Sequence, residues 1–275
     1  MDRAVRLTVA LGSGGARGFA HIGVLQALEE AGIRVSGVAG SSMGALIGAV
    51  YATGAPVVML ERIATHLPLG HWIDFTVPRM GLIAGERLQE LLKLLTKAQT
   101  FEQTKIPLAV VATDLELGER VVFRSGPIHE AVRASIAIPG IFTPHSYQGR
   151  LLVDGGVIDR VPIDAARLLD ADFVLAVDVG LFERLPPVRN VLDVVIQSMD
   201  IMEREIFRHR ILQADYVVRP QLELMSATSF SNIGEAIEAG RQAMRASLGG
   251  LWEALDRKGL VRDDLARHAK QSEIG

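Results

Sequence analysis

The sequence predicts an α/β protein built on a mostly parallel central sheet. Short apolar runs rich in β-forming residues alternate with longer stretches of helical periodicity, and strand, turn and helix follow one another twice within about the first fifty residues. This alternation favours parallel strands joined by crossover helices. With 275 residues, 49% of them hydrophobic, the chain can bury one large core, and we expect a single domain over residues 1–275.

The elements are predicted from the period of the apolar residues and from glycine or proline at their ends. Continuous apolar runs indicate buried strands, whereas apolar residues three or four positions apart indicate helices. Gly32 and Pro56 punctuate the first two helices. In chain order we expect strand 6–11, helix 19–31, strand 35–39, helix 45–53, helix 87–96, strand 107–113, an antiparallel neighbour at 120–124, helix 128–134, strands 151–153 and 173–179, helix 191–213, strand 216–219 and helix 233–255.

The composition excludes several classes of function. The chain lacks cysteine, so disulfides, thiolate catalysis and cysteine-bound zinc are ruled out, and a net charge of -3 gives no indication of nucleic acid binding. Residues 35–60 carry no charge and are long enough to span a bilayer, but their glycines, serines and Pro56 favour a buried α/β segment instead. Because the N-terminal segment lacks the pattern of a signal peptide, we expect a cytoplasmic protein.

The Gly-rich turn at 12–18 has two functional interpretations. It fails the dinucleotide fingerprint, because the required glycines are out of register and no acidic residue for a ribose follows between 31 and 60. Alternatively, the backbone N–H groups of Gly14 and Gly15, with Arg17 nearby, could bind the oxyanion of an acyl intermediate. A glycine turn that only lets the strand and helix pack remains an equal alternative on this segment alone.

The best candidate for a nucleophile is Ser42. It is the central residue of Gly40-Ser41-Ser42-Met43-Gly44, a G-x-S-x-G motif placed where a strand gives way to a helix. Glycine two positions to either side leaves room for the sharp turn that exposes the serine hydroxyl. The N-terminus of the following helix can help to stabilise negative charge there.

A serine nucleophile needs a base, and the histidines fit this role poorly. His145 is the least implausible of the seven, but it precedes the aspartate that should come before a triad histidine. Asp154 follows a short apolar strand and precedes Gly155 and Gly156, so its carboxylate can approach another loop. Asp178, also at the end of a strand, is a rival. Burial would have to raise the pKa of either carboxyl group to make it an effective base.

Taken together, these segments resemble the patatin-like phospholipase family. The resemblance rests on SGGARG at 13–18, GSSMG at 40–44, DGG at 154–156 and the stretch 134–144, and it runs from about 7 to 162. It implies a three-layer α/β/α fold and a Ser-Asp dyad, without metal or cofactor, that hydrolyses acyl esters of lipids. Ser42 would be the nucleophile and Asp154 the general base, with an oxyanion loop formed by Gly14, Gly15, Arg17 and Gly18.

The resemblance has two departures: Ser13 replaces the first glycine of the oxyanion pattern, and Asp159-Arg160 adds charge to the run before Pro162. We expect a motif-bearing core at about 7–187 and a mainly helical extension at about 188–275, which is a candidate for covering an acyl groove or for a subunit interface.

The expected partner is a lipid or ester substrate, and peripheral contact with a membrane is a candidate role for one apolar loop. The oligomeric state stays open. A non-catalytic, partner-binding protein that retains the hydrolase scaffold is the alternative function. The residues of the candidate lid or membrane-touching loop, for which completing the core is the favoured alternative, are Leu67, Leu69, Trp72, Ile73, Phe75 and Val77.

Overall fold

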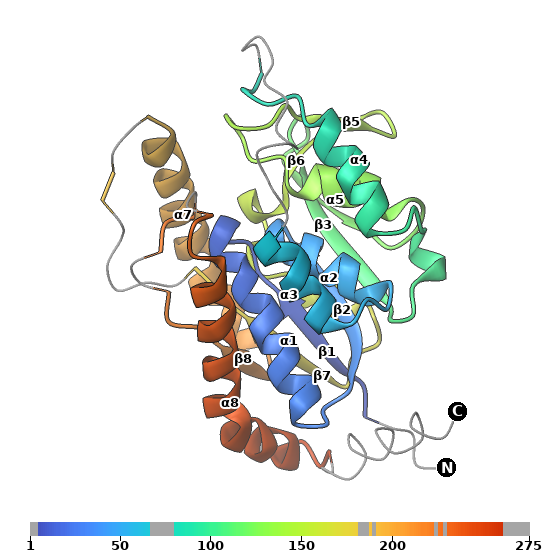
Figure 1. Cartoon of the computed structure of the whole chain (residues 1–275), viewed down its shortest axis with the longest axis vertical. Coiled ribbons are helices and arrows are strands. Elements are labelled where there is room, and N and C mark those ends of the chain that lie inside the picture. The colour runs from blue at the N-terminus through green and yellow to red at the C-terminus, as the bar shows by residue number, and fades with distance from the viewer. Residues whose placement is uncertain are drawn as a thin grey trace.

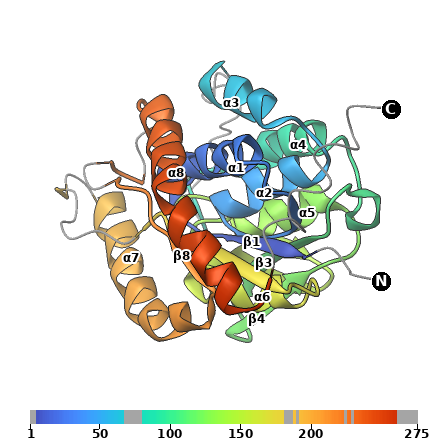
Figure 2. The same cartoon turned by 90° about the horizontal axis from the view of Figure 1, so that it is seen from below.

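The computed structural model describes residues 5–66, 80–180, 187–188, 191–222, 225–227 and 230–260. Within these residues an eight-stranded sheet lies between helical layers, which confirms the predicted α/β/α fold (Figures 1 and 2). The strands run in the order β5-β6-β3-β2-β1-β7-β8, and β4 pairs with β3 off this path. The strands are β1 (Leu7–Leu11), β2 (Val35–Ser41), β3 (Leu108–Asp114), β4 (Glu119–Phe123), β5 (His145–Tyr147), β6 (Arg150–Asp154), β7 (Phe173–Val177) and β8 (Tyr216–Val218).

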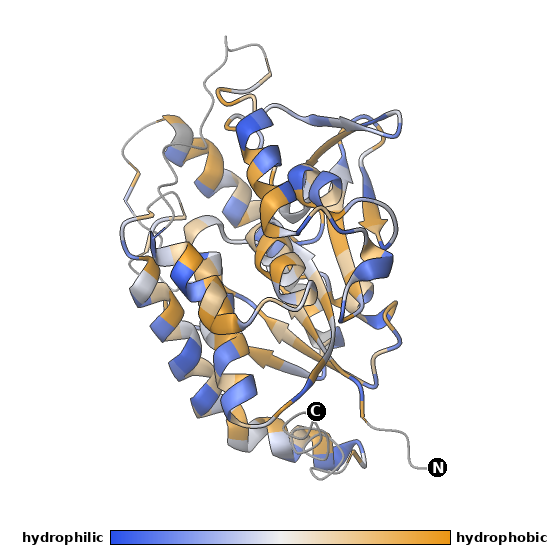
Figure 3. Cartoon of the chain, turned by 45° about the vertical axis from the view of Figure 1, so that its right-hand side comes forward, coloured by the Kyte–Doolittle hydropathy of each residue, from blue (hydrophilic) through white to orange (hydrophobic). Residues whose placement is uncertain are grey.

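The sheet is parallel over most of its width and antiparallel at one side. Strands β3, β2, β1, β7 and β8 run parallel to one another. Strands β4 and β6 run antiparallel to β3, as the sequence predicts for the run after 113, and β5 runs antiparallel to β6. Strands β1, β3 and β7 are buried on both faces, which explains why they are mainly apolar along their length rather than alternating (Figure 3).

Helices cover both faces of the sheet and give it two cores. Leu7, Val9 and Leu11 of β1 belong to the larger core, together with apolar side chains of the helices on that face. The smaller core lies on the opposite face. The helices are α1 (Ala20–Glu30), α2 (Met43–Ala52), α3 (Val57–His66), α4 (Glu86–Leu95), α5 (Ile128–Ser135), α6 (Ile163–Arg167), α7 (Val191–Arg210) and α8 (Ile233–Arg257).

The smaller core is built on small side chains. Ala109, Ala39, Ala10 and Ala176 form a row across four neighbouring strands of the sheet. Apolar side chains of α6 and of the turn before it pack in the same cluster. Because alanine adds little height to the sheet surface, α6 can approach the strands closely.

Helix α3 was not predicted, and it divides the uncharged stretch 35–60. Gly54, in a left-handed conformation, follows α2, and the carbonyl of Pro56 accepts the first hydrogen bonds of α3 from Met59 and Leu60. The stretch is therefore β2, α2 and the start of α3 rather than one continuous helix. Among the described helices, none is both long and apolar enough to cross a bilayer. The predicted lid loop at 67–77 lies outside the described residues.

The segment after residue 188 adds helix α7, strand β8 and helix α8 to the same architecture. Strand β8 extends the sheet next to β7, and α8 packs along α1. The contact between these helices depends on two glycines. A Cβ atom at Gly23 would collide with the backbone of Ile237 and Arg241, and one at Gly240 would collide with the carbonyl of Ala20. The two backbones can approach this closely only without those side chains.

We expect Gly240→Ala to lower the free energy of unfolding by about 2–4 kcal/mol, because the new methyl group forces α8 away from α1. Urea denaturation measures the change. Gly249→Ala, on the same helix, is the matched control, since a Cβ atom at Gly249 would meet nothing within 4 Å. That variant should gain roughly 0.5–1 kcal/mol from helix propensity. Equal effects of the two substitutions would contradict the close approach.

Candidate active site

Ser42 lies at a strained turn between β2 and α2. Its backbone has φ 54° and ψ -122°, a conformation that non-glycine residues rarely adopt. A Cβ atom at Gly40 would collide with Gly44 and Ala45, and one at Gly44 would collide with the carbonyl of Leu11. Both motif glycines are therefore required for steric reasons. Strain of this kind costs about 1–3 kcal/mol and persists where the surrounding structure enforces it.

Strand β3 aligns the ends of two other strands beside this turn. Ser41, the last residue of β2, pairs with Val111, and Asp154, the last residue of β6, pairs with the next residue, Ala112. Val111 and Ala112 of β3 both pair with β4 along one edge of β3. Strands β2 and β6 therefore share the opposite edge, where they lie end to end with their C-terminal ends meeting. Ser42 and Asp154 are thereby brought together, although 112 positions separate them in the sequence.

The side chains of Ser42 and Asp154 are in direct contact. Ser42 Oγ donates a hydrogen bond of 2.5 Å to Asp154 Oδ2, and the backbone N–H of Gly156 donates one of 2.8 Å to Oδ1. Thr113 Oγ1 donates a hydrogen bond of 2.8 Å to the backbone carbonyl of Asp154. Both carboxylate oxygens of Asp154 are thus oriented, and one of them faces the serine hydroxyl.

Burial raises the pKa of Asp154 from its ordinary value of 3.8 to about 7. The hydrogen bonds from Ser42 and Gly156 oppose this rise, whereas the negative charge of Asp200 adds to it. A carboxylate with a pKa near 7 is a much stronger base than a solvated one. The burial that the sequence analysis requires of an aspartate base is present at this position.

Ser135, at the end of α5, supports the turn and was missed by the sequence analysis. Its hydroxyl accepts a hydrogen bond of 2.9 Å from the backbone N–H of Ser42 and donates one of 2.6 Å to the carbonyl of Val111. It therefore ties the strained turn to β3. The segment 134–144 resembles the family, but nothing in its pattern distinguishes a bridging serine from a helix-terminal one.

The glycine loop follows β1 and leads into a 3-10 helix, Gly15–Phe19. Ser13 donates its backbone N–H to the carbonyl of Arg160, and Ala16 donates to that of Ala227. Among the described residues, the N–H groups of Gly14 and Gly15, which are the two predicted oxyanion donors, meet no backbone acceptor.

The same loop touches both of the other motifs. A Cβ atom at Gly18 would collide with Met43, the residue after Ser42, and one at Gly156 would collide with Ser13. A Cβ atom at Gly155 would collide with the carbonyl of Val111. The glycines of the three motifs are therefore points at which separate segments meet.

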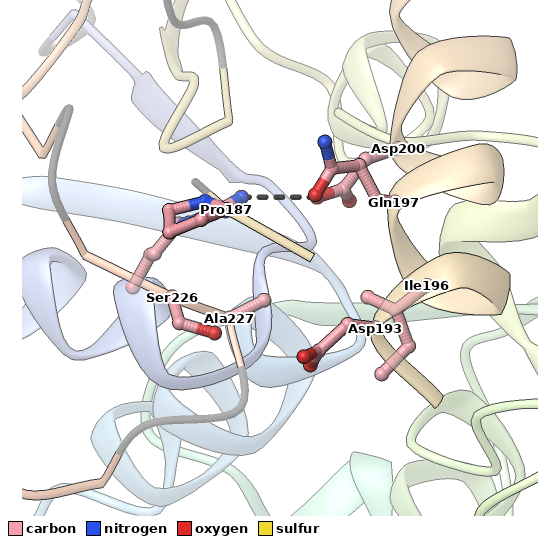
Figure 4. A pocket seen from close by; sticks show the side chains of 8 residues that line it. Pro187, Asp193, Ile196, Gln197, Asp200, Ser226 and Ala227 are labelled. Carbon is pink, nitrogen blue, oxygen red and sulfur yellow. Dashed lines mark hydrogen bonds and ion pairs between the residues drawn. The ribbon is translucent and has the colours of Figure 1, made fainter. Parts of the chain in front are cut away.

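The side chain of Arg17 is directed to α7 and to the segment after β8. Its guanidinium donates to Asp200 at 3.1 Å and to the carbonyl of Met225 at 2.8 Å. Together with Asp200, Arg17 lines a pocket beside the loop, where side chains of α7 face Ser226 and Ala227 (Figure 4). The observed role of this arginine is thus to attach the glycine loop to the C-terminal part of the chain.

A second buried group from α7, Glu203, lies behind the glycine loop. Ser13 Oγ donates to its carboxylate at 3.4 Å, and Arg160 Nη1 lies 3.5 Å from the same oxygen. Burial raises the pKa of Glu203 to about 8, Arg160 opposes this, and Asp154 and Asp200 add to it. Ser13 and Arg160, which both belong to the departures from the family pattern, are therefore part of one buried network. Asp200 and Glu203 were not singled out by the sequence analysis.

The alternative partners for Ser42 are engaged elsewhere. Asp178 forms an ion pair of 3.5 Å with Arg160. His145 lies 2.7 Å from Glu130. His21 is buried under the glycine loop, where its Nε2 lies 2.8 Å from the carbonyl of Gly12, and burial lowers its pKa to about 4. Of the two strand-end carboxylates, only Asp154 contacts the serine.

Comparisons with known proteins bear on the family of this chain. Residues 9–167 match the family model described as patatin-like phospholipase. A protein of Mycobacterium bovis described as an uncharacterized NTE family protein is 42% identical over 183 residues, 66% of this chain and 51% of that protein. Patatin-like phospholipase domain-containing protein 6 of Mus musculus is 29% identical over 279 residues, 89% of this chain and 20% of that protein.

Two solved structures share the fold. The crystal structure of VipD from Legionella pneumophila superposes with a TM-score of 0.64 at 14% identity, over 90% of this chain and 67% of that chain. That of the type III effector protein ExoU has a TM-score of 0.51 at 18% identity, over 98% and 61%.

The fold and the paired side chains define an α/β protein in which a serine is held against a buried carboxylate. The chain belongs to the patatin-like phospholipase family, as its motifs predict. It spans about half the length of the mycobacterial relative, so the match alone does not assign the activity of the whole protein.

The raised pKa of Asp154 predicts a pH-dependent stability. Between pH 3.8 and about 7 the folded protein retains a proton that the unfolded chain has released, so this group makes stability fall as the pH rises. We expect Asp154→Asn, which cannot ionise, to raise the free energy of unfolding by roughly 1–3 kcal/mol near pH 8 and to change it little near pH 4. Urea denaturation at both pH values measures this difference.

Asp178→Asn is the control, because it leaves the buried Arg160 without this ionic partner. It should lower stability by about 2–4 kcal/mol at either pH. If Asp154→Asn did not raise the free energy of unfolding near pH 8, the carboxylate of Asp154 would ionise in the folded protein at no cost in stability.

Proposed function

We propose that this chain is a serine acyl-ester hydrolase that acts on lipids, with Ser42 as nucleophile and Asp154 as general base. The observation that carries the proposal is the 2.5 Å hydrogen bond between Ser42 Oγ and the carboxylate of Asp154. Membership of the patatin-like phospholipase family supports a lipid as the substrate.

In the proposed reaction, Ser42 Oγ attacks the acyl carbonyl carbon while its proton passes to Asp154 Oδ2. The carbonyl electron pair moves to oxygen and gives a tetrahedral oxyanion. As the intermediate collapses, the bond to the alcohol breaks, and the alcohol takes the proton from Asp154. Water then attacks the acyl-serine with Asp154 again as base, which releases the acid and restores Ser42.

The glycine loop would stabilise the oxyanion through its backbone. The N–H groups of Gly14 and Gly15 are the proposed donors, and each donor of this kind typically contributes about 3–4 kcal/mol of transition-state stabilisation. Gly18 allows the loop to lie against Met43, next to the nucleophile. Arg17 acts in this proposal by fixing the loop to Asp200 rather than by contacting the substrate.

An apolar pocket along α2, the helix that follows the nucleophile, supports an acyl substrate. Leu46 lines it and stands one helical turn after Ser42, whose carbonyl accepts the backbone N–H of Leu46. The 3-10 helix of the glycine loop, α2, α3 and α4 all contribute to the walls. The lining side chains include Phe19, Leu46, Ile47, Leu60, Ala64 and Leu88.

The first test is labelling and turnover at Ser42. A fluorophosphonate probe should label the wild-type protein and not Ser42→Ala, and the variant should lose at least about 1,000-fold in ester turnover because the nucleophile is absent. Mass spectrometry locates the label. Equal labelling of both proteins would remove Ser42 from the mechanism. If wild-type protein turned over no acyl ester of any length, the non-catalytic alternative would be favoured.

The base is tested by the pH profile of the same assay. Because Asp154 must be ionised to accept a proton, kcat/KM should rise with pH to a plateau, with an apparent pKa near 7. Asp154→Asn should abolish turnover, whereas His145→Asn should retain both the rate and the profile. Full activity of Asp154→Asn would assign the base to another group.

Narrowing the apolar pocket should change the preference for acyl length. Ala64→Phe places a ring among the lining side chains, and we expect the ratio of kcat/KM for long-chain to short-chain esters to fall about tenfold. A series of nitrophenyl esters measures the ratio. Ala246→Phe, at an exposed position of α8, is the control and should leave it unchanged. An unchanged ratio in Ala64→Phe would place the acyl chain elsewhere.

A further inference from the structure

Helix α7 turns an apolar side to solvent and an acidic side to the protein, which is the reverse of the usual arrangement. Val191, Val194, Ile201 and Met202 are exposed, with 78% of Val191 and 58% of Met202 accessible to solvent. Asp200 and Glu203 instead point inward to the glycine loop. A helix on the surface of a soluble protein normally buries its apolar side and exposes its charges.

The exposed apolar residues of α7 form one continuous stripe. Each of them stands three, four or seven positions from another member, so they lie on the same side of the helix. Ser198 and Glu205 are the exposed polar residues on this side among the described side chains. We call this surface the α7 stripe, and it consists of Val191, Val194, Val195, Ile201, Met202 and Ile206.

The α7 stripe lies at the outside of the molecule and next to the candidate active site. In both views of the chain α7 stands at the periphery (Figures 1 and 2). Its inner side is attached to the glycine loop by the Arg17–Asp200 ion pair. A surface that docks on the stripe would therefore lie within one helix diameter of that loop.

We propose that the α7 stripe inserts into the surface of a phospholipid bilayer and so brings the active site to its substrate. This inference rests on the proposed lipid hydrolysis, because a phospholipid substrate is supplied from a bilayer. Partial insertion of an exposed apolar helix side into the acyl boundary is an established mode of peripheral binding.

The area of the stripe favours a bilayer over a second copy of the chain. From Val191 to Ile206 the helix is about 24 Å long and presents a side about 10 Å wide, roughly 240 Å², whereas a stable dimer needs about 800 Å² from each partner. A bilayer requires no matching partner surface. Since the stripe carries no described basic side chain, its binding should depend on apolar insertion rather than on anionic lipids.

The absence of cysteine from the chain allows a site-specific test. An environment-sensitive dye on Ser198→Cys, at the centre of the stripe, should shift to the blue and brighten when phosphatidylcholine vesicles are added. The same dye on Ser146→Cys, an exposed position of β5, should not respond. Ser42→Ala as the background prevents hydrolysis of the vesicles. A Ser198 label that remains in water would overturn the proposal.

Vesicle flotation gives the second measurement. Val194→Gln/Ile201→Gln/Met202→Gln should lower the partition coefficient by about tenfold or more, and about 0.5 M salt should not. The control Val58→Gln/Met59→Gln/Leu168→Gln alters exposed residues away from α7 and should bind like wild type. Bilayer insertion would be contradicted if the stripe variant bound vesicles as well as wild type does. It would also be contradicted if the wild-type protein formed a dimer without lipid and the stripe substitutions abolished that dimer.

Turnover of a soluble short-chain ester separates this proposal from the proposed function. The stripe variant should retain that turnover while losing binding to vesicles. If wild-type protein bound vesicles but hydrolysed neither substrate, the hydrolase proposal would fail and the docking surface would stand. If the stripe variant hydrolysed vesicle lipid as fast as wild type, the docking proposal would fail and the hydrolase would stand.

Discussion

The candidate site depends on one constraint: two strands share a single edge of β3. Strand β2 ends opposite Val111 and β6 ends opposite Ala112. Ser42, which follows β2, therefore meets Asp154, the last residue of β6. A slip of one residue in β6 would move Asp154 by about 3.3 Å and turn its side chain to the other face of the sheet. Ser135 and Thr113 reinforce this register from either side of the pair.

The same constraint sets the electrostatics. Bringing Asp154 to the buried end of a strand removes water from its carboxylate, which raises its pKa and makes it a better base. The ionised form is correspondingly unfavourable for folding at neutral pH. Asp200 adds further negative charge, Glu203 adds a buried carboxyl group whose pKa is raised to about 8, and the buried guanidinium groups of Arg17 and Arg160 lie against the two. The C-terminal segment therefore contributes to the site even though it carries none of the three motifs.

The sequence predicts what depends on local geometry and leaves open what depends on pairing. Ser42 is predicted from glycine spacing, because steric room at Gly40 and Gly44 is a property of a few neighbouring residues. Asp154 and Asp178 look alike from their strands, since only the pairing with β3 decides which one reaches the serine; the family resemblance supplied that choice. Helix α3 was missed although Pro56 marks the break before it, and the carbonyl of Pro56 accepts the first hydrogen bonds of that helix. The roles of Asp200 and Glu203 follow from contacts with residues more than 180 positions away.

Helix α7 shows why apolar patterning alone does not determine which side of a helix is buried. Its stripe has the spacing of a core-facing helix, yet the structure turns the stripe outward. The inner side is fixed by Asp200 and Glu203, which meet Arg17, Ser13 and Arg160 behind the glycine loop. Buried charges are tolerated only where such partners satisfy them, so these ionic contacts can determine the rotation of the helix. The apolar residues are then left on the outside, where covering them would stabilise the orientation that these ionic contacts already favour.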